Sequence, residues 1–213
     1  MVCLGATIGN KTQTSFKVPN WILKSGHASK IKQKFLQGFF DSELSNIKFE
    51  KNKTFSHKSL KLYTCKEMNH IKGGILFLDQ IRNTLREFNV LSSEVKMDRV
   101  YKRGRDGRTM QQLFFIVYSN YINLYNFIKN VGFLYNSKRR KNSLKNFAQI
   151  ETKAKFELEK IRKYRGVIRL RKKGLSAYKI ANQLGLDVYH VKNWTYFGKK
   201  PRLYDFNKSL NSS

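Results

Sequence analysis

The sequence is poor in residues that cross-link or interrupt a chain, with only two cysteines and two prolines among 213 residues. Cys3 and Cys65 are too few for a disulfide scaffold or a zinc cluster, which indicates a reducing compartment. Without a Ser/Gly-rich tract and with so little proline, we expect no long disordered linker. The four histidines have no metal-ligand spacing, so a histidine-based metal site is not expected.

Long apolar runs are also missing. The longest, GGILFL and LFFIV, are far too short to cross a bilayer. The N-terminus has no basic segment followed by an apolar stretch, so it does not resemble a signal peptide. These absences predict a soluble cytoplasmic protein with no membrane partner.

Acidic residues are scarce: 14 Asp and Glu stand against 43 Lys and Arg, which gives a formal net charge of +29. Such self-repulsion predicts a polyanionic partner, and nucleic acid, a membrane surface and an acidic protein all qualify. A lysine bias from an AT-rich genome is an alternative cause of part of the excess. The hydrophobic fraction of 40%, with 16 Phe and 11 Tyr, is sufficient for a folded core.

The spacing of apolar residues predicts an α+β domain over the first part of the chain. Some segments fit the helical spacing of three and four, and others alternate at the period of two that is typical of strands. The Asp106–Gly107 pair is a strong hairpin signal, and Gly132 is placed to cap the last helix. The expected order is helix, strand, strand, helix, strand, strand, helix, over residues 31–42, 46–50, 59–64, 75–88, 93–103, 111–119 and 121–131.

The segment FLQGFFDSEL, residues 35–44, resembles the signature of the LAGLIDADG homing endonucleases, and the expected order of elements is also that of the family. The resemblance covers about residues 10–135 and implies an αββαββα domain whose four strands form a saddle in the DNA major groove. Gly38 and Ser42 are four residues apart, so they share one helix face and allow a second helix to approach closely. In the family, that second helix belongs to a two-fold mate.

The resemblance further implies a catalytic centre at the end of this helix. Glu43 would be the metal ligand and Asp41 a supporting or structural acid, with Mg²⁺ held between the glutamates of two copies. Two departures from the family pattern affect this implication. Leu44 stands where the family has Gly, and Tyr118 stands in the fourth-strand region where many members carry a basic residue. A chain with one motif is expected to form a homodimer, and a truncated half of a two-motif enzyme is the alternative.

Basic residues on the expected saddle suit contacts with phosphates and guanine edges. Some of them lie opposite the apolar positions of their strands, and the others crowd the second hairpin. A solvated charged face is the alternative for part of the set. The predicted DNA-binding residues of this region are Lys48, Lys61, Lys96, Lys102, Arg103, Arg105 and Arg108.

A second motif, AYKIANQLGLDVYHVKNW over residues 177–194, fits the helix-turn-helix pattern. Gly185 is the turn glycine, and Ser176 and Asp187 are expected to cap the two helices. Between residues 161 and 202 there are 12 basic residues and one acidic residue, which suits contact with phosphates. A three-helix bundle for protein contacts is the alternative. The residues expected to be exposed on the recognition helix or near its edge are Tyr189, His190, Lys192, Asn193 and Thr195, of which Tyr189, Lys192 and Asn193 are the predicted DNA contacts.

The basic run Lys138–Lys141 marks the boundary between the two parts, and Ser143 is expected to cap the helix that follows it. The predicted organisation is an α+β domain with its lead-in over 1–135, a basic linker and helix over 136–160, and a helix-turn-helix domain over 161–205.

The sequence favours a site-specific DNA endonuclease of the LAGLIDADG type, a nucleoid-associated enzyme that hydrolyses double-stranded DNA with Mg²⁺ in intron homing. A catalytically degenerate DNA-binding regulator is the main alternative, because of the departures at Leu44 and Tyr118. An intron maturase that binds RNA is a third alternative. The sequence shows no aromatic-rich segment for binding single-stranded RNA that would favour the maturase alternative.

Overall fold

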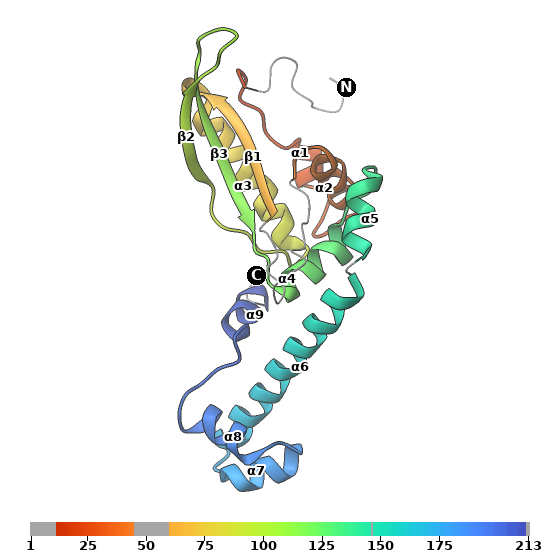
Figure 1. Cartoon of the computed structure of the whole chain (residues 1–213), viewed down its shortest axis with the longest axis vertical. Coiled ribbons are helices and arrows are strands. Elements are labelled where there is room, and N and C mark those ends of the chain that lie inside the picture. The colour runs from red at the N-terminus through yellow and green to blue at the C-terminus, as the bar shows by residue number, and fades with distance from the viewer. Residues whose placement is uncertain (1–11, 45–59, 146, 212–213) are drawn as a thin grey trace. The chain divides into compact units, whose positions relative to one another are not determined.

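A computed structural model of the chain describes residues 12–44, 60–145 and 147–211 (Figure 1). The chain divides into two compact units, Met1–Ala148 and Gln149–Ser213, here called unit 1 and unit 2. Within the described residues of unit 1 the elements are α1 (Asn20–Leu23), α2 (Lys30–Glu43), β1 (Leu60–Glu67), the short helix η2 (Met68–His70), α3 (Ile71–Glu87), β2 (Lys96–Lys102), β3 (Thr109–Val117), α4 (Tyr121–Asn126), the π-helix η3 (Phe127–Val131) and α5 (Ser137–Lys145). The remaining elements are α6 (Phe147–Lys172), α7 (Ala177–Leu184), α8 (Val188–Thr195) and α9 (Tyr204–Asn211).

The expected mixed α+β class is confirmed. The described part of unit 1 contains a three-stranded antiparallel sheet in the order β1-β3-β2. The strand expected at residues 46–50 lies outside the described residues. No helix in the described ranges is both long enough and apolar enough to span a membrane.

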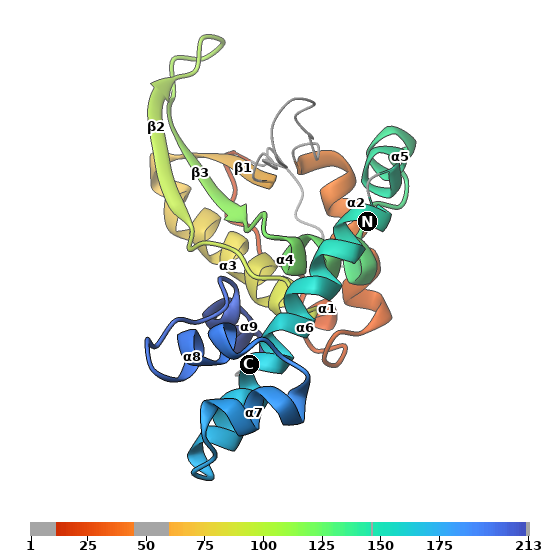
Figure 2. The same cartoon turned by 60° about the horizontal axis from the view of Figure 1, so that its bottom comes forward.

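The sheet packs one face against α3, which runs behind the strands in Figure 1. Leu62 of β1 lies opposite Phe115 of β3, and neither side chain is exposed. From α3, Leu78, Ile81 and Leu85 are fully buried, as their spacing of three and four predicts for one helical face. On the other face of the sheet Lys61, Tyr63 and Phe114 are half-buried. The β2–β3 hairpin projects past the end of α3 in both views (Figures 1 and 2).

Helix α2, which carries the first motif, is held at both ends. At its start, the Ser29 hydroxyl accepts a hydrogen bond from the Lys32 amide, the usual arrangement of an N-cap. Lys32 itself is 4% exposed, and its Nζ lies 2.8 Å from Glu87 Oε1 of α3. At the other end, Leu44 is fully buried in an extended conformation and forms an isolated bridge with Leu62. The motif helix is therefore fixed to both α3 and the sheet.

The expectation that Ser143 caps a helix was wrong. Ser143 lies inside α5, is buried, and its hydroxyl donates to the Arg140 carbonyl at 2.8 Å. The cap of α5 is Asn136, whose side-chain oxygen accepts a hydrogen bond from the Arg139 amide at 3.0 Å. Because Asn136 satisfies the free amides at the start of the helix, the helix begins at Ser137, before the position expected from Ser143.

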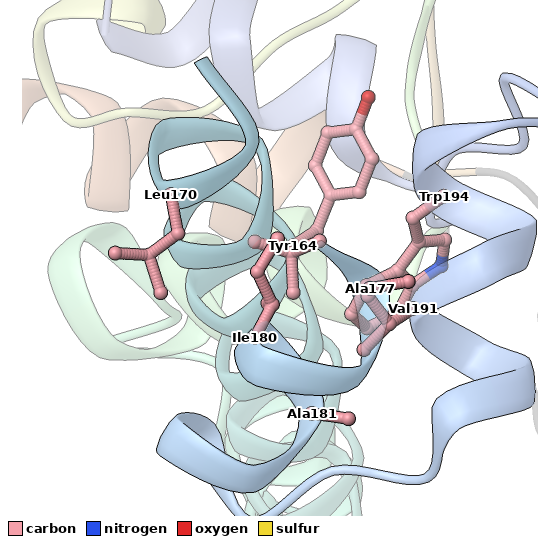
Figure 3. Packing of buried hydrophobic residues seen from close by; sticks show 8 residues of the cluster. Tyr164, Leu170, Ala177, Ile180, Ala181, Val191 and Trp194 are labelled. Atoms are coloured by element: carbon pink, nitrogen blue, oxygen red, sulfur yellow. The ribbon is translucent and has the colours of Figure 1, made fainter. Parts of the chain in front are cut away.

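Unit 2 contains the helix-turn-helix geometry that its sequence predicts. The turn residue Gly185 has φ 59° and ψ 42°, the left-handed conformation that glycine adopts without steric cost. The Ser176 hydroxyl accepts from the Lys179 amide, and the Asp187 carboxylate accepts from the amides at the start of α8. The hydrophobic core joins the C-terminal part of α6 to α7 and α8 through residues that include Tyr164, Leu170, Ala177, Ile180, Ala181, Val191 and Trp194 (Figure 3).

Candidate nucleic-acid interfaces

The C-terminal end of α2 is tied to the segment that precedes α5. One carboxylate oxygen of Asp41, Oδ2, accepts hydrogen bonds from the backbone amides of Leu134 (3.1 Å) and Tyr135 (2.6 Å). The Arg139 guanidinium donates to the Phe40 carbonyl at 2.6 Å. The other oxygen of Asp41, Oδ1, is buried and has no hydrogen-bond partner among the described residues. The carboxylate of Asp41 therefore caps a loop of its own chain.

Glu43 lies in the last turn of α2 and is half-buried. Within the described ranges, no group of three or more His, Cys, Asp and Glu side chains could hold a metal ion. Carboxylate oxygens are nevertheless the donors that Mg²⁺ prefers. With Asp41 Oδ1 buried, Glu43 is the carboxylate at this end of α2 that could reach a metal ion, and water or a second molecule would supply the other ligands.

The face of α2 expected to pack on a second helix is open in the single chain. Gly38 is half-buried and Ser42 is exposed. A Cβ atom built on Gly38 would meet the Tyr135 ring at 3.9 Å, which is ordinary van der Waals contact. Tyr135 is itself 73% exposed. Packing within the described chain therefore does not require glycine at position 38.

Leu44 and Tyr118, the two residues that depart from the LAGLIDADG pattern, have different surroundings. Leu44 has φ −80°, an angle open to any residue, and its side chain belongs to the core. Glycine is therefore not needed at this position. Tyr118 follows the last residue of β3 and is 42% exposed, and its carbonyl accepts a hydrogen bond from the Asn123 amide group at 2.8 Å.

The tip of the β2–β3 hairpin is a network of alternating charges. Arg103 pairs with Asp106, and Arg108 lies 2.7 Å from Glu67 of β1. The hydrogen bond from the Arg103 guanidinium lowers the pKa of Asp106 to about 2, and the hydrogen bond from Arg108 lowers the pKa of Glu67. Two of the predicted DNA-binding arginines thus neutralise acids of their own unit. Arg105 is exposed at the tip between them.

The other predicted basic residues of unit 1 lie along the sheet. Lys96 and Lys102 of β2 are exposed. Lys61 of β1 is half-buried on the face of the sheet away from α3, with its Nζ 5.6 Å from the centre of the Phe114 ring. Lys48 lies outside the described residues. The free edge of the hairpin therefore carries exposed cations, while the sheet centre is partly aromatic.

One lysine of β1 is buried, which was not predicted from the sequence. Lys66 of β1 has no exposed surface, its Nζ donates to the Thr14 carbonyl at 2.8 Å, and the same atom lies 3.9 Å from the centre of the Phe16 ring. The alternation of side chains along β1 could have predicted this burial, because Leu60, Leu62 and Lys66 lie on the same side of the strand. Lys66 fastens the N-terminal segment to the sheet and does not face solvent.

In unit 2, α8 presents Tyr189 and His190 to solvent, as expected, and Lys192 is half-buried. The expectation that Asn193 is exposed was wrong, because it is 8% exposed. After α8 the Lys199 amide donates to the backbone carbonyl of Asn193 at 3.1 Å. Asn193 is therefore not available for contact with a base. Thr195 is half-buried, and its hydroxyl donates to the Val191 carbonyl at 2.8 Å.

Two further features of unit 2 were not predicted. The first is an open pocket of about 440 Å³ on the side of α6, lined by Arg165, Ile168, Arg169, Lys172, Lys173 and Tyr204. Four cations around an apolar floor suit a phosphate group. The second is a set of exposed aromatic side chains beside the recognition helix, Tyr178 (62%), Tyr196 (54%) and Phe197 (68%), in addition to Tyr189 (66%).

No protein-family model matches the chain, and no solved structure matches it. Over 161 residues the chain is 26% identical to the tRNA-splicing ligase RtcB of Methanopyrus kandleri, in a match that covers 74% of this chain and 14% of that protein. Over 155 residues it is 27% identical to the DNA-directed RNA polymerase subunit Rpo1N of Methanocaldococcus jannaschii, with 72% of this chain and 11% of that protein covered. The chain thus spans a seventh or less of the length of these curated relatives. Because each match covers almost three quarters of this chain, the two matched stretches overlap. A similar stretch therefore occurs in two proteins of different name, and neither name transfers to this chain.

Proposed function

We propose that the chain binds double-stranded DNA, with α8 of unit 2 in the major groove. The observation that carries the proposal is the helix-turn-helix geometry of unit 2, in which Gly185 makes a left-handed turn between two capped helices. In such a motif the second helix reads base edges while the flanking residues contact phosphates. Tyr189 and Lys192 lie on the accessible side of α8, in a region with 12 basic residues and one acidic residue between positions 161 and 202.

We further propose that the hairpin of unit 1 adds phosphate contacts. The exposed residues Lys96, Lys102 and Arg105 are the candidates. Arg103 and Arg108 contribute less, because their charges are offset by Asp106 and Glu67. Basic side chains of this kind increase affinity without reading sequence.

The catalytic proposal is that two copies meet through the Gly38 and Ser42 face of α2 and hydrolyse DNA there. The surroundings of Gly38 support this, since among the described residues no neighbour lies close enough to require glycine there. Glu43 of each copy would hold Mg²⁺, with water molecules completing its coordination. A bound Mg²⁺ would activate water and stabilise the leaving oxygen of a phosphodiester.

A DNA-binding protein without nuclease activity is the second candidate. It is favoured by the contacts of Asp41, whose Oδ2 is occupied by the amides of Leu134 and Tyr135. A carboxylate that caps its own loop has one oxygen left for a metal ion. Replacement of the family's glycine by the buried Leu44 favours the same candidate.

Salt-dependent binding tests the first proposal. We expect the affinity of the full chain for duplex DNA to fall steeply with salt, because each neutralised phosphate adds about 0.9 to the log–log slope. The combined variant Lys96→Ala, Lys102→Ala and Arg105→Ala should reduce that slope. An affinity that does not change with salt would rule out the proposed mode of binding.

Cleavage of the genomic DNA that flanks the gene separates the two candidates. If the chain is a nuclease, it cuts this DNA with Mg²⁺, and Glu43→Gln abolishes cutting while the binding of DNA persists. Glu94→Gln, at an exposed acid elsewhere in unit 1, is the matched control and should leave cutting unchanged. Tight binding of duplex DNA without cutting under any divalent ion would establish the non-catalytic candidate.

A further inference from the structure

Along α8, aromatic and basic side chains alternate on one face. Tyr189, Lys192 and Tyr196 are separated by three and four residues, so they lie in line along the helix. The two tyrosines are about 10 Å apart along the axis, from a rise of about 1.5 Å per residue. This face is accessible, because the residues Tyr189 and Tyr196 are more than half exposed, whereas Asn193 is buried.

Two cation–π contacts connect this line to the adjacent helices. Lys192 Nζ lies 4.8 Å from the centre of the Tyr178 ring of α7 and 3.3 Å from its hydroxyl oxygen. The Arg171 guanidinium of α6 lies 5.0 Å from the centre of the Tyr196 ring. Together with the exposed Phe197, the residues Arg171, Tyr178, Tyr189, Lys192 and Tyr196 form what we call the aromatic–cation ladder. Each cation holds a ring in place while more than half of that ring's residue stays exposed.

Contact with a paired duplex would leave much of the exposed aromatic surface of the ladder without a partner. In a duplex the faces of the bases are covered by their neighbours, so a side chain reaches only base edges, sugars and phosphates. A tyrosine hydroxyl can bond to these groups. Phe197, which follows Tyr196 and is 68% exposed, has no polar atom for such a bond. Exposed rings beside cations are instead the arrangement that binds unpaired bases by stacking while the backbone is neutralised.

We propose that the aromatic–cation ladder binds unpaired bases, so that unit 2 prefers a site where a duplex is locally open to one that is fully paired. The inference rests on the proposed binding of nucleic acid and adds the state of the strand that is recognised. The segment that holds the ladder has 12 basic residues and one acidic residue between positions 161 and 202, and this charge favours a nucleic acid over a protein surface that is poor in acidic residues. The chemistry is shared by single-stranded DNA and RNA.

The test measures binding of the full chain to fluorescent probes of one sequence: a paired duplex, the same duplex with a central unpaired bubble, and the bubble strand alone as DNA or RNA. We expect the bubble to bind about fivefold or more tightly than the paired duplex, which is the contribution of one stacked base. Tyr189→Ala and Phe197→Ala should remove most of that difference, and Tyr189→Phe should keep it. Phe156→Ala is the matched control, because Phe156 is an equally exposed aromatic residue of α6 outside the ladder.

The possible outcomes separate the binding of unpaired bases by the ladder from the binding of duplex DNA proposed above. Equal affinity for the bubble and the paired duplex would overturn the inference and leave the binding of duplex DNA intact. The same loss in Phe156→Ala as in Tyr189→Ala would also overturn it, because the effect would not belong to the ladder. No binding to any probe at low salt would remove the proposed function itself. If the RNA strand binds more tightly than the DNA strand, the ladder holds unpaired bases of RNA, and the reverse result assigns them to DNA.

Discussion

The charge network at the tip of the hairpin contains two carboxylates, Glu67 and Asp106. Asp106 accepts hydrogen bonds from the Arg103 guanidinium and lies within 3.5 Å of Arg108 Nε. Without Asp106, Arg103 and Arg108 would both depend on Glu67 for an acidic partner among the described residues. The pKa of Asp106 is lowered from 3.8 to about 2, since Arg103 stabilises the charged form.

The first prediction concerns the pH dependence of this network. A carboxyl group whose pKa is lower in the folded state stabilises that state above the unfolded value of 3.8, and the contribution is lost as the pH falls through about 2. Asp106→Asn should therefore loosen the hairpin at neutral pH, and its effect should shrink as the pH falls from 3.8 through about 2. The carboxyl carbon shift of Asp106, followed by NMR, should titrate near 2 and move upward in Arg103→Gln. An unchanged midpoint in Arg103→Gln would contradict the assigned cause.

Single residues mark the limit of what the sequence predicts. Exposure on α8 was predicted from helical spacing, which is correct for Tyr189 and wrong for Asn193. Asn193 is buried by packing with other parts of the chain, and spacing within the helix contains no information about that packing. The cap at Asn136 was missed for a related reason, because Asn136 and Ser143 are both suitable capping residues and the choice depends on the bonds that hold the segment to α2.

At the scale of elements, local signals predicted well where the conformation is determined locally. The αL glycine at position 185, the caps at Ser176 and Asp187, and the amphipathic spacing of α3 are each properties of a few neighbouring residues. Contacts between segments that are distant in the sequence could not be predicted in the same way. The buried ion pair of Lys32 and Glu87 joins residues 55 positions apart, and nothing in either neighbourhood indicates the partner.

The second prediction compares two glycines of unit 2. Gly185→Ala places a Cβ atom on a residue with φ 59°, and we expect a loss of about 1–2 kcal/mol in the free energy of unfolding of this unit. Gly166→Ala, in the middle of α6, should instead stabilise by about 0.5–1 kcal/mol, because alanine favours the helix. Its Cβ would lie 3.6 Å from the Leu184 side chain, which is ordinary contact. Thermal denaturation of both variants measures the difference, and equal shifts would show that the turn does not need its left-handed residue.

At the scale of the whole molecule, the formal charge of +29 is distributed over both units. In unit 1 some of the basic residues form ion pairs within the unit, as with Glu67 and Asp106. In unit 2 the segment between positions 161 and 202 has 12 basic residues and one acidic residue. Each unit can therefore contribute to binding a polyanion, since unit 1 has 27 basic and 9 acidic residues and unit 2 has 16 and 5. The two contributions are tied to different elements, so variants in the hairpin and in α8 can be compared separately.

The third prediction concerns the proposed dimer. Gly38→Leu adds a side chain to the open face of α2, where the described part of the chain offers only ordinary contact with the Tyr135 ring. The fold of the single chain should tolerate it, so the melting temperature should change little. A second α2 helix could no longer approach closely, and sedimentation velocity should then detect monomer where the parent chain forms dimer. Asn83→Leu, at an exposed position of α3, is the control for an added leucine. If Gly38→Leu associates as the parent chain does, the face of α2 is not the dimer contact, and any metal site at Glu43 must be completed in another way.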